Sequence, residues 1–174
     1  DTARVDTLGQ VTGIGAGVVR VIATAGAAAD TVVVVVRSFD VVYVDASWTG
    51  TSTGSASQPW RTLDSGVAHV PPGGVVRVRA GVYAIAQPVV IDKRLRLWGD
   101  GPASTVLRWT GETDDAVRIQ NVDSVEIRGV RITKAGYHGI TAAGTAGRGL
   151  RLVLTDVTVD SSAKHGVNVG VGTA

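Results

Sequence analysis

The chain has 174 residues, of which 44% are hydrophobic, and this is enough for one or two small domains with a buried core. It contains no cysteine, which excludes disulfides and thiolate metal sites, and its formal net charge of only +2 argues against nucleic-acid binding. No stretch reaches the roughly 18 apolar residues that cross a bilayer, so we predict no transmembrane segment. The 23 glycines and the many valines and threonines favour turns and strands over helices.

Residues 1–37 alternate between short apolar runs and glycine-rich turns. The runs at residues 18–22 and 31–36 have strand periodicity, and residues 13–17 form the richest glycine cluster. This pattern predicts a meander of antiparallel strands. Because strands and not a helix follow the glycine cluster, it is not a dinucleotide-binding fingerprint.

This first segment resembles the second half of a bacterial group 2 Ig-like domain. The family turn motif D-x-x-G-x-V-T-G-x-x-x-G is matched by Asp6, Gly9, Val11, Thr12, Gly13 and Gly17. An Ig-like sandwich needs about 100 residues and about seven strands. The resemblance therefore implies that residues 1–37 are the C-terminal part of an Ig-like domain, with the remaining strands upstream or on another chain.

Residues 41–174 form a second domain of different character. A strand at residues 41–45 leads into a small polar loop, and a helix is expected near residues 59–70, where Leu63, Val67 and Val70 have helical spacing. Short strands are then expected at residues 75–78, 82–85, 89–91, 95–97 and 106–109.

A repeat near the end of the chain predicts the architecture of this domain. Residues 125–140 recur 27 residues later as residues 152–167, with apolar residues alternating inside each copy. Repeats of this length made of short strands are typical of a solenoid, in which each coil buries its inner face only by stacking on a neighbour.

The second domain also resembles the opening of right-handed parallel β-helix proteins of the pectate-lyase-like superfamily. The family signature is matched by Tyr43, Val44, Asp45, Pro59, Trp60, Arg61, Thr62, Leu63, Gly74, Val76, Val78, Gly81 and Tyr83, and then by Leu95, Leu97, Gly99 and Gly101. The resemblance implies that the helix near residues 59–70 caps the solenoid. We thus expect an all-β protein: a partial Ig-like β-sandwich followed by the capped N-terminal coils of a right-handed parallel β-helix, truncated at the C-terminus.

Two histidines are the first candidates for chemistry. His138 and His165 are one repeat apart and are expected to stack at about 4.8 Å. Two imidazoles can bind a metal or act as acid and base. No third ligand has matching spacing, however, and duplication of a coil also places identical residues in a turn ladder, which is the interpretation we favour.

The carboxylates are the second candidates. They are Asp100, Glu112, Asp114, Asp115, Asp123, Asp156 and Asp160. Enzymes of the pectate-lyase-like superfamily use such residues for Ca²⁺ or for hydrolysis, with an Arg or Lys base in the lyases. Arg131 or Lys134 could take that role here only if a neighbouring coil supplied Asp ligands. The residues do not assemble a complete set, so we predict no catalytic residue, no metal site and no cofactor.

The four tryptophans are candidates for contacts with sugars. Trp60 is expected in the core, Trp98 and Trp109 on the outside, and Trp48 in an exposed loop. The predicted surface contacts are Trp48, His138 and His165.

The sequence thus predicts a non-catalytic structural or interaction segment of a larger exported bacterial surface or envelope protein. Its partners would be other protein subunits or additional coils of the same chain, with polysaccharide as a further ligand class, and its location would be extracytoplasmic. Two alternatives stay open: the N-terminal part of a polysaccharide lyase or glycoside hydrolase, and an accessory subunit of an envelope complex whose partners cover its open edges.

Overall fold

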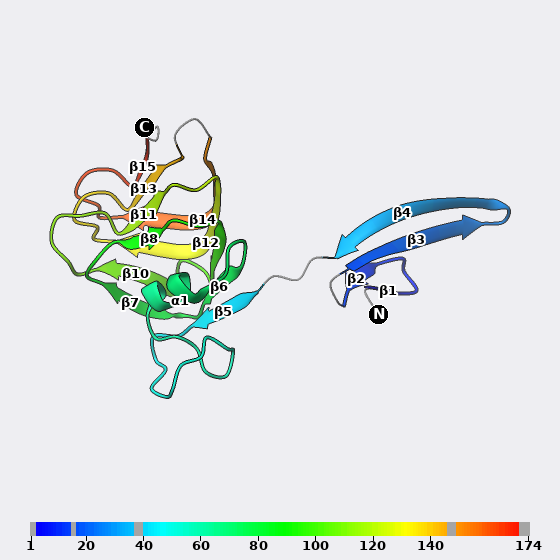
Figure 1. The fold of residues 1–174 in the computed structure, drawn as a ribbon, viewed down its shortest axis with the longest axis horizontal. Coiled ribbons are helices and arrows are strands. Elements are labelled where there is room, and N and C mark those ends of the chain that lie inside the picture. The colour runs from blue at the N-terminus through cyan, green and yellow to red at the C-terminus, as the bar shows by residue number, and fades with distance from the viewer. Residues whose placement is uncertain (1–2, 15–16, 37–39, 146–148, 171–174) are drawn as a thin grey trace. The chain divides into compact units, whose positions relative to one another are not determined.

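The computed structural model describes residues 3–14, 17–36, 40–145 and 149–170. The chain divides into two compact units, Asp1–Phe39 and Asp40–Ala174 (Figure 1). Strands make up 52% of the protein and helix only 4%, which confirms the predicted all-β class. The first unit contains small antiparallel sheets and the second is a β-solenoid of about three turns.

The first unit contains two separate antiparallel pairs. Strand β1 (Ala3–Val5) pairs with β2 (Val11–Gly13), and β3 (Gly17–Ala25) pairs along its whole length with β4 (Ala28–Val36). Gly26 begins the short turn between β3 and β4 at φ 62°, a left-handed conformation that favours glycine. The antiparallel strands expected from the sequence are therefore present, as two-stranded sheets.

The second unit is built from short strands that pair in parallel. They are β5 (Val41–Val44), β6 (Val75–Val78), β7 (Gly81–Ile85), β8 (Val89–Ile91), β9 (Leu95–Gly99), β10 (Thr105–Trp109), β11 (Val117–Gln120), β12 (Ser124–Thr133), β13 (Ile140–Ala143), β14 (Arg151–Asp160) and β15 (Val167–Gly170). One helix, α1 (Leu63–His69), lies between β5 and β6.

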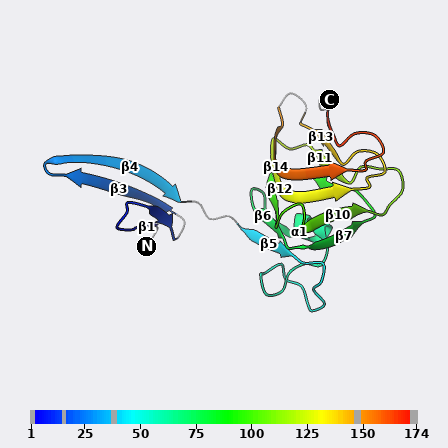
Figure 2. The same cartoon turned by 180° about the vertical axis from the view of Figure 1, so that it is seen from behind.

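The strands stack into three parallel ladders that wrap around one core. The first ladder runs through β5, β6, β9 and the first halves of β12 and β14, and the second through β7, β10 and the second halves of β12 and β14. The third runs through β8, β11, β13 and β15. Figure 2 shows β12 and β14 lying side by side across the face of the solenoid. Each coil thus contributes one strand segment to each ladder.

The long strands β12 and β14 change ladder at residues with positive φ. Gly129 has φ 63° and Asp156, one repeat later, has φ 52°. Lys134 (φ 64°) and Ser161 (φ 55°) show the same relation after the second ladder. The left-handed conformation turns the chain sharply, and its recurrence at equivalent positions keeps successive coils in register.

The predicted repeat is confirmed as stacked coils. Val125 lies opposite Leu152 and Ile132 lies opposite Val159 in the pairing of β12 with β14. In the third ladder, Ile140 of β13 lies opposite Val167 of β15. Residues related by the repeat therefore stand directly above one another, as the sequence indicated.

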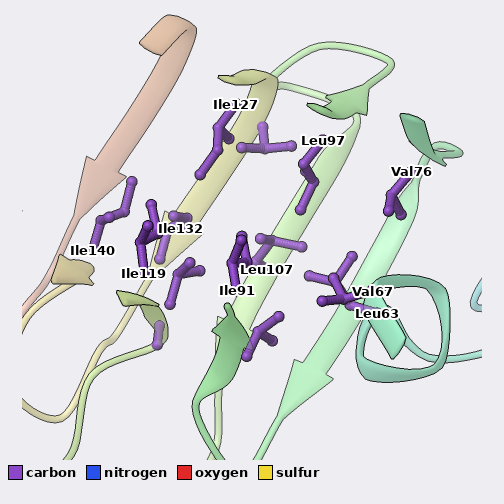
Figure 3. Close-up of a cluster of buried hydrophobic side chains, with 14 of the residues drawn as sticks. Leu63, Val67, Val76, Ile91, Leu97, Leu107, Ile119, Ile127, Ile132 and Ile140 are labelled. Carbon is purple, nitrogen blue, oxygen red and sulfur yellow. The ribbon is translucent and has the colours of Figure 1, made fainter. Parts of the chain in front are cut away.

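The core lies inside the coils and is almost entirely aliphatic. Figure 3 shows branched side chains from different coils pointing toward one another. Leu97, Ile119 and Ile127 belong to three different strands and are at most 1% exposed. Burial of such a side chain contributes about 1.5–3 kcal/mol, so the inner coils hold most of the stability.

The cap helix is shorter than the sequence suggested. It begins after Thr62, whose hydroxyl accepts a hydrogen bond from the backbone of Ser65, and it ends before Val70. The predicted span from residue 59 is wrong because Trp60 exchanges backbone hydrogen bonds with the strand end around Val44 instead. Helix α1 packs against β8, β5 and β6, at the first strands of the solenoid.

Candidate functional site

The last coil, β14 and β15, presents apolar side chains that the inner coils bury. Leu154 is 37% exposed, whereas its ladder neighbour Ile127 is 1% exposed. Val167 is 39% exposed, whereas its neighbour Ile140 is fully buried. The exposed residues stand at repeat positions whose side chains are buried in the preceding coil. This surface is therefore apolar like the core. We call it the open-coil face.

The backbone of the open-coil face also has one edge that no described strand covers. Among the described residues, β14 pairs only with β12 and β15 only with β13. Each strand therefore has one edge whose N–H and C=O groups belong to no ladder within that part of the chain. A parallel edge next to apolar side chains is the surface on which another strand stacks.

A second feature is a polar cluster beside the third ladder. The carboxylate of Asp115 lies 2.9 Å from Nδ1 of His138 and also accepts a hydrogen bond from the backbone N–H of His138. The hydroxyl of Thr141 lies 3.1 Å from the same Nδ1. Arg118 forms ion pairs with both Asp114 and Asp115. The cluster therefore fixes the imidazole and compensates the buried carboxylate.

The predicted stacking of the two histidines is confirmed. The rings of His138 and His165 are parallel within 6°, with centroids 5.4 Å apart. The structure corrects the expectation that both form surface contacts, because His138 is only 6% exposed while His165 is exposed. Lys164 donates a hydrogen bond of 2.5 Å to the hydroxyl of Tyr137, which ties the last coil to the preceding coil at the same corner.

The contacts of this polar cluster hold two neighbouring coils together. Arg118 pairs with Asp114 and Asp115 of its own coil, and Asp115 bonds to His138 of the neighbouring coil. Within the described ranges, no three His, Cys, Asp or Glu side chains are grouped so that they could hold a metal ion. The contact between Asp115 and His138 was missed from the sequence because nothing in their 23-residue separation signals it.

The other candidate carboxylates are mostly held in ion pairs between coils. Asp160 accepts hydrogen bonds of 2.6 Å from Thr133 and from Arg131, and these two bonds lower the pKa of its carboxyl group. Asp100 bonds to Arg77, and Asp123 bonds to Arg94. Arg131, considered as a catalytic base from the sequence, therefore lies against a carboxylate.

The tryptophans divide between core and surface in a way that the sequence predicted only in part. Trp109 is buried, so the expected outward position is wrong, because its indole N–H donates to the backbone of Glu112 beneath the turn. Trp98 does lie outward, under the guanidinium of Arg128 at 3.8 Å. Trp60 packs against the core and stacks on His69.

Trp48, the predicted exposed contact, is half-buried in its own loop. Its indole N–H donates to the carbonyl of Thr51 at 3.2 Å, and its ring covers Gly50 so closely that a Cβ there would lie 2.6 Å from it. The ring thus stabilises the loop, and only part of it is available to a ligand.

A groove beside the cap was not anticipated from the sequence. It has a volume of about 440 Å³ and lies between the start of α1 and strand β7. Arg61 and Asp64 contribute its charges, and burial raises the pKa of the Asp64 carboxyl group. Burial also raises the pKa of Tyr83, on the wall of the groove, to about 12, and its hydroxyl donates to backbone carbonyls.

Comparison with known families and curated proteins shows no relationship, so only the fold defines a class. No protein-family model matches the chain, and no curated protein matches it. Fold and surface define it as a parallel β-solenoid preceded by small antiparallel sheets. In the part of the chain that the structure describes, no helix is both long and apolar enough to cross a membrane.

Proposed function

We propose that this chain is a non-catalytic structural or interaction segment of a larger exported bacterial surface or envelope protein. The open-coil face carries this proposal, because it combines core side chains with an unpaired parallel edge. The finer relationship, to the pectate-lyase-like superfamily and to group 2 Ig-like domains, is proposed on the sequence motifs given above. The extracytoplasmic location belongs to the same proposal.

The proposed interaction is the stacking of a further coil on β14 and β15. That coil would come from the same polypeptide or from another subunit. Covering Leu154, Val167 and Val169 would remove from water the parts of these side chains that are still exposed. Complete burial of such a side chain is worth about 1.5–3 kcal/mol, and each would contribute the share of that value that its exposed part represents. Strand pairing would satisfy the free backbone edge at the same time.

Hydrogen exchange tests this function directly. The amides of β14 and β15 are compared in this chain alone and in the intact protein from its natural source, with β9 and β11 as internal controls. We expect at least tenfold slower exchange in β14 and β15 of the intact protein and little change in the controls. Equal exchange of β14 and β15 in both samples would contradict the proposal.

A polysaccharide-degradation assay separates the enzymatic alternative. Cleavage of polygalacturonate or alginate by this chain, lost on substitution of Asp115 or Arg131, would overturn the non-catalytic assignment. We expect no cleavage, because these two side chains are held in ion pairs with Arg118 and Asp160.

A further inference from the structure

The groove beside the cap holds two opposite charges that do not pair with each other. Arg61 precedes helix α1 and Asp64 lies in its first turn, and both line the groove. In the part of the chain that the structure describes, neither side chain forms an ion pair. Several other arginines of the solenoid are held by carboxylates, as Arg77 is by Asp100. The groove therefore presents one cation and one anion to a ligand.

The carboxyl group of Asp64 lacks part of the solvation that it would have in open water. The residue as a whole is exposed, but partial burial of its carboxyl group raises the pKa, and this effect outweighs a hydrogen bond from its own backbone N–H. A group that loses water without gaining a charged partner favours an incoming cation. Hydrogen bonds to an ionised partner are about twice as strong as neutral ones, so an ammonium group suits this position.

One wall of the groove is apolar. Val82 and Ala84 point to the same outward side of β7, because alternate residues of a strand share a face. Val82 is 50% exposed, so a hydrocarbon group laid against it would remove apolar surface from water. The groove has a volume of about 440 Å³, within the range of about 300–1,000 Å³ that is typical of small-molecule sites.

We propose that this groove binds a small zwitterion of the α-amino acid class. The ammonium group of the ligand pairs with Asp64, its carboxylate pairs with Arg61, and its aliphatic side chain lies against Val82 and Ala84. The site is built from these side chains and does not use the backbone N–H groups of α1.

The positions and signs of the two charges select this class of ligand. Residues 61 and 64 are three apart, and three residues span at most about 11 Å, so the two charges of the ligand must be close together, as they are on one α-carbon. A purely anionic or purely cationic ligand would leave either Arg61 or Asp64 unpaired and would be repelled by the group of like charge.

Nuclear magnetic resonance of the amide groups tests the site, with L-leucine as the probe. We expect shifts confined to the backbone of residues 46, 61–64 and 82–85, and a dissociation constant of about 1 mM, as for a ligand of this size. Leucinamide carries only the cation and 4-methylpentanoate only the anion. Each should bind about tenfold more weakly than L-leucine, because one hydrogen-bonded charge pair is lost.

Two substitutions separate the contributions of the charges. Arg61→Gln and Asp64→Asn should each weaken binding of L-leucine by about tenfold. The matched controls are Arg151→Gln and Asp92→Asn, which remove the same charges from exposed side chains outside the groove and should leave binding within about twofold. An amide spectrum that is unchanged away from the substituted residue shows that each variant is folded.

Three outcomes would overturn the proposal. The first is the absence of shifts around the groove with L-leucine at up to about 20 mM. The second is equal affinity for L-leucine and for either singly charged analogue, which would indicate a site for one charge only. The third is an affinity for L-leucine that the groove variants and the control variants change to the same extent.

Discussion

The coil of β12 and β13 and the coil of β14 and β15 have the same sequence pattern but different surroundings. In the first, Ile127 and Ile140 are covered from both sides, whereas in the second their counterparts Leu154 and Val167 are covered from one side only. A repeat therefore specifies the register of each coil, while burial depends on whether another coil lies beyond it. Substitutions at equivalent positions should show how much stability that second neighbour supplies.

The largest contrast is expected between the paired core residues of the two coils. Ile127→Ala should destabilise the solenoid by about 2–5 kcal/mol, because it leaves a cavity in a packed interior. Leu154→Ala should cost about 1 kcal/mol, because its side chain is already partly in water. Urea denaturation of both variants measures the difference, and equal losses would show that the last coil is buried in solution.

The bend between the first and second ladders should give the next largest contrast. A Cβ on Gly129 would lie 2.7 Å from the carbonyl oxygen of Gly99 at φ 63°, so Gly129→Ala should cost about 1–3 kcal/mol. Asp156 holds the equivalent position in the last coil at φ 52°, so Asp156→Gly should change stability by less than about 1 kcal/mol. Thermal unfolding of both variants tests this order, and a larger effect at residue 156 would reverse it.

The stacked histidines should differ as well. His138→Ala removes a partner of the buried Asp115 carboxylate, and we expect a loss of about 1–3 kcal/mol. His165→Ala, on the exposed side of the stack, should change stability by less than about 0.5 kcal/mol. Chemical denaturation at neutral pH provides the measurement, and comparable losses would mean that the exposed ring contributes as much as the buried one.

The smallest effect concerns the ion pair that links the two coils. Hydrogen bonds from Thr133 and Arg131 lower the pKa of Asp160 below its ordinary value of 3.8. A lowered folded-state pKa stabilises the protein above pH 3.8, and this contribution is lost as pH falls through the folded pKa. Asp160→Asn should therefore weaken the fall in urea midpoint at acidic pH, with Asp156→Asn as the control. An unchanged pH dependence would contradict this role.

The sequence predicted best where neighbours in space are related by a simple rule. Alternation identified the inward residues of each strand, and the 27-residue offset placed Val125 opposite Leu152 and His138 beneath His165. These relations depend on the backbone repeat alone. Prediction was poorer at turns: the pairing of Trp60 with the backbone near Val44 shortened the helix, and the turn at Glu112 buried Trp109.

What the sequence determined by itself is the all-β class, the division of character near residue 40 and the register of the stacked coils, because periodicity depends on local backbone geometry. Only the tertiary structure decided that Asp115 meets His138 and that Leu154 and Val167 remain exposed. Such properties depend on what lies one coil away. Side chains that are alike along the chain acquire different roles when one has a neighbour on both sides and the other has a neighbour on one.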